Sequence, residues 1–99
     1  MKAVIIEDEQ KSRDMLADIL KKNFPQITIL GLAKNVAEGV EFIQALKPNL
    51  LFLDISMPDG TGFDVLEKVQ GAKFDIIFTT ATDKHALKAI KYSACDYLL

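Results

Sequence analysis

Three acidic residues each follow a short apolar run, and this pattern is the one in the sequence most able to carry chemistry. Glu7 and Asp8 come directly after the run at 2–6, and Asp54 comes directly after the run at 50–53. Carboxylates brought into one small volume repel one another and raise one another's pKa. A hard dication such as Mg²⁺ removes that repulsion, because it prefers oxygen ligands in octahedral geometry. These residues therefore indicate a Mg²⁺ site, provided that the fold brings them together.

The elements that would position these acids alternate between apolar runs and amphipathic stretches. Strands are predicted at 2–6, 27–33, 50–53, 76–80 and 97–99. Helices are predicted at 10–24, between the cap Asn35 and Pro48, around 63–69, and after Asp83. Glu38 stands three residues after Asn35, as in a capping box. In the same helix Val36, Val40, Ile43 and Leu46 are predicted to share the inner face.

Strand–helix alternation at this spacing predicts an α/β fold, a doubly wound parallel sheet with helices on both faces. The expected strand order is 2-1-3-4-5, which is the flavodoxin-like and CheY-like order. In such sheets ligands bind beyond the carboxyl ends of the strands, where the winding reverses. That point lies between the first and third strands, so the acids after these two strands are expected to converge.

Composition limits the classes of protein that remain. Of 99 residues, 49% are hydrophobic and 26% charged, as in an ordinary soluble domain. No apolar run approaches the roughly 18 residues that span a membrane, and no secretory leader is recognised. A single cysteine, Cys95, and a single histidine, His85, do not make a usual structural zinc site. A net charge of −2 argues against nucleic-acid binding by this segment itself. Taken together, these features lead us to expect a small cytoplasmic domain.

The chain resembles a bacterial response-regulator receiver domain, of the CheY-like family. The matching pieces occur in order along the whole chain, each at a strand end: Glu7-Asp8, Asp54 with Met57-Pro58-Asp59-Gly60, Thr80-Ala81, and Asp96-Tyr97-Leu98-Leu99. The resemblance implies that Asp54 accepts a phosphoryl group from a phosphohistidine on a sensor histidine kinase or phosphotransfer protein. It implies a signalling phosphoacceptor rather than an enzyme, one that assists its own phosphotransfer and autodephosphorylation.

The resemblance also implies the roles of the surrounding residues. Glu7, Asp8, Asp54 and the backbone carbonyl of Ser56 would hold Mg²⁺. The Thr80 hydroxyl would hydrogen-bond a phosphoryl oxygen and move on phosphorylation, whereas Thr79, on the opposite face of the strand, is interpreted as a packing residue. Tyr97 matches the aromatic position that turns inward with this threonine. Ser56 and Thr82 match the two positions that tune how long the phosphoryl group persists.

Two features depart from the family pattern. Glu7 replaces the commoner aspartate of the acid pair, which favours a longer or water-mediated contact with the metal. The family places a lysine directly after the fifth strand and then a last helix, and the 99 residues end in that strand. We therefore expect residues 1–99 to be a C-terminally incomplete receiver domain. Apolar surface left uncovered would make the chain poorly stable alone or favour a homodimer.

The output and the alternatives follow from the same residues. Residues 76–87 look similar to the receivers of LytTR-type transcription regulators, so DNA would be contacted only through a domain absent from this chain. The main alternative is a degenerate receiver acting as a phosphorylation-independent protein-binding module. A flavodoxin-like FMN carrier is disfavoured because the acids at 7–9 would repel phosphate. An aspartate-nucleophile phosphatase would need a second acid where Ser56 stands.

Overall fold

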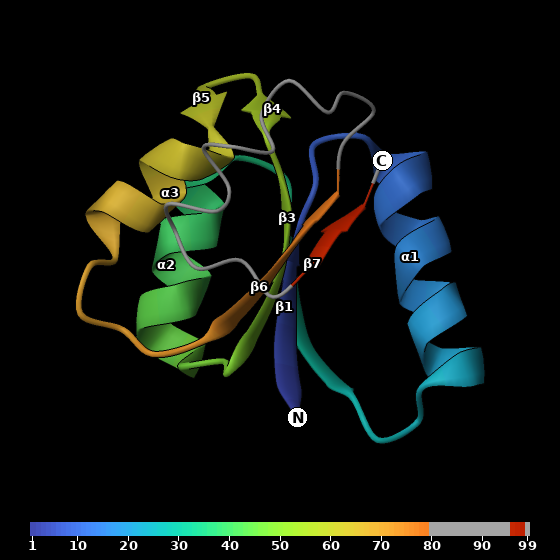
Figure 1. Cartoon of the computed structure of the whole chain (residues 1–99). Coiled ribbons are helices and arrows are strands. Elements are labelled where there is room, and N and C mark those ends of the chain that lie inside the picture. The colour runs from blue at the N-terminus through green and yellow to red at the C-terminus, as the bar shows by residue number, and fades with distance from the viewer. Residues whose placement is uncertain (80–95, 99) are drawn as a thin grey trace.

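The computed structural model describes residues 1–79 and 96–98, and these form an α/β fold (Figure 1). Its strands and helices are, in chain order, β1 (Lys2–Ile6), α1 (Gln10–Asn23), β2 (Thr28–Ala33), α2 (Val36–Leu46), β3 (Leu50–Asp54), β4 (Ser56–Met57), β5 (Gly60–Thr61), α3 (Gly62–Lys68), β6 (Asp75–Thr79) and β7 (Asp96–Leu98). The predicted helix after Asp83, together with Thr80 and Thr82, lies outside the described residues.

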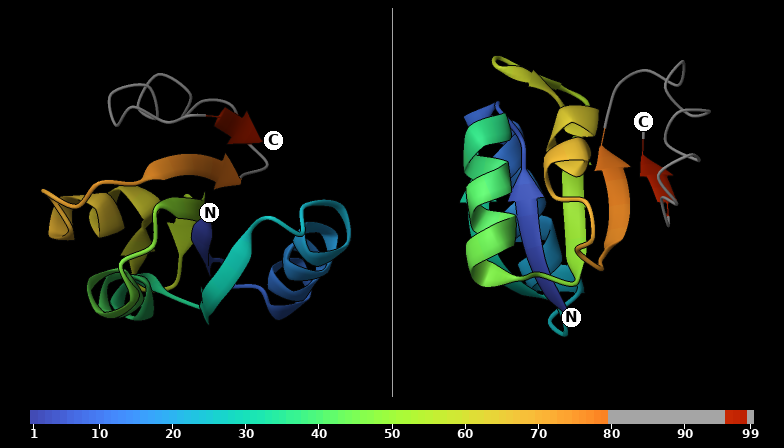
Figure 2. Two further views of the ribbon diagram at one scale, coloured as in Figure 1. Left: turned by 90° about the horizontal axis from the view of Figure 1, so that it is seen from below. Right: turned by 90° about the vertical axis from the view of Figure 1, so that its left-hand side faces the viewer.

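The five main strands form one parallel sheet of order β2-β1-β3-β6-β7. Counted without the short β4–β5 hairpin, this is the predicted order 2-1-3-4-5, and the predicted fold class is confirmed. Figures 1 and 2 show α1 on one face of the sheet and α2 with α3 on the other. The hairpin stands at the carboxyl ends of the strands, at the same edge as the ends of β1 and β3 (Figure 1).

Both faces of the central strands are buried, which explains their nearly continuous apolar sequences. Successive side chains point to opposite faces, so β1 and β3 contribute alternately to two core clusters. Ala3, Ile5, Leu50 and Phe52 pack with Ala17 and Leu20 of α1. Val4, Ile6, Leu51 and Leu53 pack with residues of α2 and α3, and with Phe78 of β6. The strands that carry the acids at their ends are therefore held firmly from both sides.

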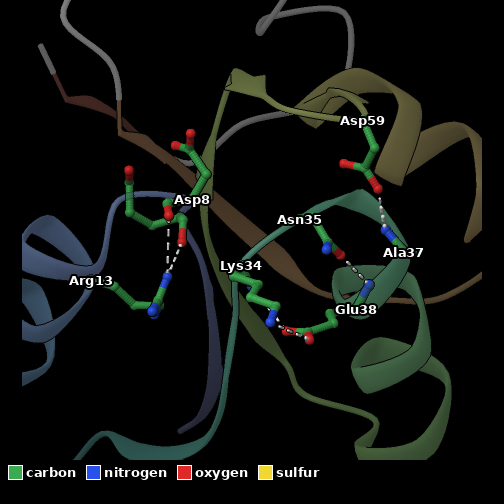
Figure 3. Close-up of polar contacts among 8 residues, drawn as sticks. Asp8, Arg13, Lys34, Asn35, Ala37, Glu38 and Asp59 are labelled. Carbon is green, nitrogen blue, oxygen red and sulfur yellow. Dashed lines mark hydrogen bonds and ion pairs between the residues drawn. The ribbon is translucent and has the colours of Figure 1, made fainter.

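The start of α2 agrees with the predicted cap but not with the complete capping box. The Asn35 side chain accepts a hydrogen bond from the Glu38 backbone N–H at 2.8 Å. The Glu38 carboxylate does not return to Asn35. It accepts from the Lys34 backbone N–H at 3.1 Å and lies 3.9 Å from the Lys34 Nζ (Figure 3). A full capping box occurs instead at the start of α3, between Thr61 and Asp64.

One predicted position on a helix face was wrong. Leu46 was placed on the inner face of α2 but is 41% exposed, because the last turn of that helix lies over the edge strand β2 near Gly31 rather than over the centre of the sheet. On α1, Ala17 and Leu20 are buried, whereas Met15 is 63% exposed. Within residues 1–79 and 96–98, no helix is both long and apolar enough to cross a membrane.

Candidate functional site

Three carboxylates meet at the carboxyl ends of β1 and β3. The register pairs Ile6 with Leu53, so Glu7 and Asp54 follow directly on adjacent strands. One carboxylate oxygen from each of Glu7, Asp8 and Asp54 lies within 4.8 Å of the others. The convergence expected from the sequence is thus present. It follows from the parallel register, because strands that run in the same direction end at the same edge of the sheet.

Hydrogen bonds fix the backbone and two of the carboxylates. The Glu7 carboxylate accepts from the Glu9 backbone N–H at 3.1 Å, and Asp54 Oδ1 accepts from the Ile55 backbone N–H at 2.8 Å. From α1, the Arg13 guanidinium donates to the Glu7 carbonyl at 2.8 Å and to the Asp8 carbonyl at 3.4 Å (Figure 3). Arg13 therefore ties the acid pair to α1 through the main chain.

Burial and mutual repulsion make the charged forms of two of these acids unfavourable. The pKa of Glu7 is raised from 4.5 to about 7, mainly by burial and also by the neighbouring Asp54 and Asp8 carboxylates, while the Glu9 N–H opposes the rise. The pKa of Asp54 is likewise raised from 3.8 to about 6, mainly by burial and also by repulsion from Asp8, while the Ile55 N–H opposes the rise. The site gathers negative charge in a place where water only partly screens it.

The donor set fits Mg²⁺. All three side chains offer carboxylate oxygens, the ligand that hard dications prefer, and they come close enough to bind one ion together. Asp8 is exposed while Glu7 and Asp54 are half-buried, which leaves one side of the cluster open to water and to phosphate oxygens. A bound dication would also offset the repulsion that contributes to the rise of both pKa values.

The loop after Asp54 is packed tightly against the strand end. Ser56, the predicted carbonyl ligand, begins β4 and pairs with Thr61 of β5. The Gly62 N–H donates to the Ile55 carbonyl at 2.8 Å. A Cβ on Gly62 would lie 2.5 Å from the Asp54 carbonyl oxygen, so only glycine allows α3 to start this close to the strand.

The predicted switch residues are only partly within the described region. Thr79 is half-buried and pairs in register with Asp54, which places the end of β6 beside the acid cluster. Thr80, the residue predicted to contact the phosphoryl group, follows it outside the described residues, as does Thr82. Tyr97 lies in β7, paired with Phe78 of β6. The roles of these three residues stay predictions.

One contact of the loop after Asp54 was missed by the sequence interpretation. Asp59 was noted only as part of the Met-Pro-Asp-Gly run, yet its carboxylate accepts hydrogen bonds from the first two backbone amides of α2 (Figure 3). An aspartate in a loop beside a helix start is a possible cap, but local sequence gives no sign of which helix it reaches when the partner is 22 or 23 residues away.

Comparison with known proteins agrees with this arrangement. Residues 3–99 match the response regulator receiver domain family. The chain is 41% identical to the sensory transduction protein LytT of Enterococcus faecalis and 36% identical to the transcriptional regulatory protein BtsR of Escherichia coli, in each case over all of this chain and 41% of the relative. The chain thus spans about two fifths of the length of these curated relatives.

A solved structure is similar over the whole chain. The response regulatory domain of the Klebsiella pneumoniae protein mrkE superimposes with a TM-score of 0.90 at 31% identity, covering 100% of this chain and 82% of that domain. The sequence match, the similarity to this domain, and the carboxylates at the ends of β1 and β3 all agree. This chain belongs to the family of response regulator receiver domains of two-component signalling.

Proposed function

We propose that Asp54 is the phosphoacceptor and that it takes a phosphoryl group from a kinase phosphohistidine in a Mg²⁺-dependent reaction. The observation that carries this proposal is the meeting of Glu7, Asp8 and Asp54 oxygens within 4.8 Å at the carboxyl ends of β1 and β3. A lone aspartate is a poor acceptor. Two further carboxylates beside an aspartate can bind, together with it, the metal ion that makes phosphoryl transfer possible.

The chemistry divides between the metal and the protein. When bound, Mg²⁺ would neutralise charge on the carboxylates and on the phosphoryl oxygens. A carboxylate oxygen of Asp54 attacks phosphorus, an acyl phosphate bond forms, and the bond from phosphorus to the kinase imidazole nitrogen breaks. The Ile55 N–H, which hydrogen-bonds Asp54 Oδ1, fixes one oxygen and leaves the other for attack. Glu7 and Asp8 would hold the metal together with Asp54, and the Ser56 carbonyl would be the further protein ligand.

The signal would leave the site through β6 and β7. Thr80 would hydrogen-bond the phosphoryl group, Tyr97 would turn inward with it, and Ser56 and Thr82 would influence the lifetime of the acyl phosphate. Such a switch is a population shift between two arrangements, worth a few kcal/mol. Relatives named as sensory transduction and transcriptional regulatory proteins support an output in transcription, through a domain outside these 99 residues.

The test is intact-mass spectrometry after treatment with acetyl phosphate, with and without Mg²⁺. We expect a single phosphoryl adduct that requires Mg²⁺ and is absent from Asp54→Asn. Asp18→Asn, which removes an exposed carboxylate from α1 outside the cluster, serves as the matched control and should retain the adduct.

A version extended through the next native residues should be run in parallel. An adduct on the extended version alone would mean that residues after Leu99 are needed for the reaction. An adduct that persists in Asp54→Asn would show that Asp54 is not the phosphoacceptor. Absence of an adduct from both wild-type versions would instead favour a degenerate receiver that acts as a binding module.

A further inference from the structure

The segment between Asp54 and α3 is a small hairpin made of β4 and β5. Ser56 and Met57 of β4 pair in antiparallel register with Thr61 and Gly60 of β5. Asp59 stands in the turn between the two short strands. At its base the hairpin is held by the Gly62 N–H, which donates to the Ile55 carbonyl at 2.8 Å. A side chain that anchors the tip of the hairpin therefore restrains the whole loop, including Ser56 at its base.

Asp59 provides such an anchor. Its Oδ1 accepts from the Val36 backbone N–H at 2.8 Å, and its Oδ2 accepts from the Ala37 backbone N–H at 3.1 Å (Figure 3). Both amides belong to the first turn of α2, where helix N–H groups have no partner within the helix. The two hydrogen bonds also lower the pKa of Asp59, so the carboxylate is ionised at neutral pH.

The same helix end has a second and independent cap. The Asn35 side chain accepts from the Glu38 N–H at 2.8 Å, and the Gly39 N–H donates to the Asn35 carbonyl at 3.0 Å. α2 thus has a local cap of the ordinary kind from Asn35. Asp59 adds contacts from another element, 22 and 23 residues along the chain from its two partners. These contacts restrain the hairpin as well as the helix.

Packing around the tip makes the attachment specific. Met57 is buried in the core cluster shared with Val36. A Cβ on Gly60 would lie 3.3 Å from Val36 Cγ2 and 2.6 Å from Asp64 Oδ2, and its φ of +152° belongs to the region that favours glycine. The hairpin therefore lies directly against the start of α2, and a shift of its tip would move Ser56 at its base.

We propose that Asp59 is a positioning residue for the metal site: by holding the hairpin tip on the first turn of α2, it fixes the Ser56 carbonyl relative to Asp54. This inference rests on the proposed function, because Ser56 matters in this way only if its carbonyl binds Mg²⁺. Groups that orient ligands from outside the coordination shell commonly change metal affinity by about 10- to 100-fold. By reciprocity, Mg²⁺ binding should strengthen the contact between Asp59 and α2.

The test compares Asp59→Ala with Asn35→Ala. Both variants remove cap hydrogen bonds from the first turn of α2, but only the first frees the hairpin. Mg²⁺ affinity is measured by isothermal titration calorimetry. Amide hydrogen exchange at Gly62, Val36 and Ala37 is followed by NMR with and without Mg²⁺. Asp59→Asn, which keeps one acceptor oxygen, is the conservative variant in case Asp59→Ala does not fold.

We expect Asp59→Ala to weaken Mg²⁺ binding by about tenfold, Asp59→Asn to weaken it less, and Asn35→Ala to stay within about twofold of wild type. In the metal-free protein, the Gly62 amide should exchange faster in Asp59→Ala than in Asn35→Ala. Equal Mg²⁺ affinity in the two alanine variants would overturn the inference and leave Asp59 as a helix cap only.

Failure of the proposed function would look different. A wild-type protein that binds no Mg²⁺ would refute the metal site, and with it the metal-positioning role of Asp59. The metal-free exchange of Gly62 would then still decide whether Asp59 holds the hairpin.

Discussion

Replacing Asp54 with asparagine should stabilise the metal-free protein, even though it removes the proposed phosphoacceptor. Asparagine has almost the same shape as aspartate, and its Oδ1 can still accept the hydrogen bond that the Ile55 N–H now donates at 2.8 Å. The substitution therefore removes a charge without changing the packing. That charge is unfavourable here, because burial and the neighbouring Asp8 raise the pKa of Asp54 to about 6.

The magnitude follows from the pKa. A rise from 3.8 to about 6 corresponds, at about 1.4 kcal/mol per pKa unit, to at most about 3 kcal/mol of destabilisation by the charged form. Water screens a half-buried carboxylate, so we expect about 1 kcal/mol at pH 8. The folded pKa of Asp54 exceeds the unfolded one, so its stabilising contribution is complete below about pH 3.8 and is lost as the pH rises through about 6.

The assay is thermal unfolding followed by far-ultraviolet circular dichroism in the presence of a chelator, since the chain has no tryptophan. At pH 8, Asp54→Asn should unfold with a melting temperature about 4–8 °C above wild type. Its advantage should shrink by about half at pH 5, where the wild-type carboxyl is largely protonated. Asp18→Asn controls for net charge. The reasoning is refuted if the two variants are equally stable at pH 8, or if the advantage does not depend on pH.

Three further predictions concern the same site. Asp8→Asn should lower Mg²⁺ affinity by at least about tenfold in calorimetry, and unchanged affinity would exclude Asp8 as a ligand. Mg²⁺ affinity of the wild type should fall as the pH is lowered from 8 to 6, and Mg²⁺ binding should release protons, because Glu7 with a pKa of about 7 and Asp54 with a pKa of about 6 must ionise before they bind the metal. Calorimetric titration in two buffers measures the proton release. A Mg²⁺ affinity that does not change with pH would contradict the prediction. Gly62→Ala should destabilise the fold by about 1–3 kcal/mol in urea, since its Cβ would lie 2.5 Å from a carbonyl oxygen. Gly31→Ala, whose Cβ would meet only movable side-chain atoms at 3.2 Å, should cost less, and equal losses would argue against the clash.

Sequence patterns predicted the elements well where local periodicity is strong. The apolar runs of β1 and β3 are buried on both faces, and such runs have few other stable places in a soluble domain. The acids directly after them could then be placed at one edge of the sheet from strand order alone. Less was predictable at the periphery. Leu46 and Met15 fit a helical period, but whether such a position is covered depends on how far the sheet extends beneath the helix.

What the sequence by itself determined is therefore the order of the sheet, the family, and the meeting of Glu7 and Asp8 with Asp54, because each follows from local pattern and parallel topology. The tertiary structure decided how close the carboxylates come and how far burial raises two of their pKa values. It also decided that Asp59 reaches α2 rather than solvent. These last features depend on packing between segments distant in the chain, and local sequence does not encode the distances between them.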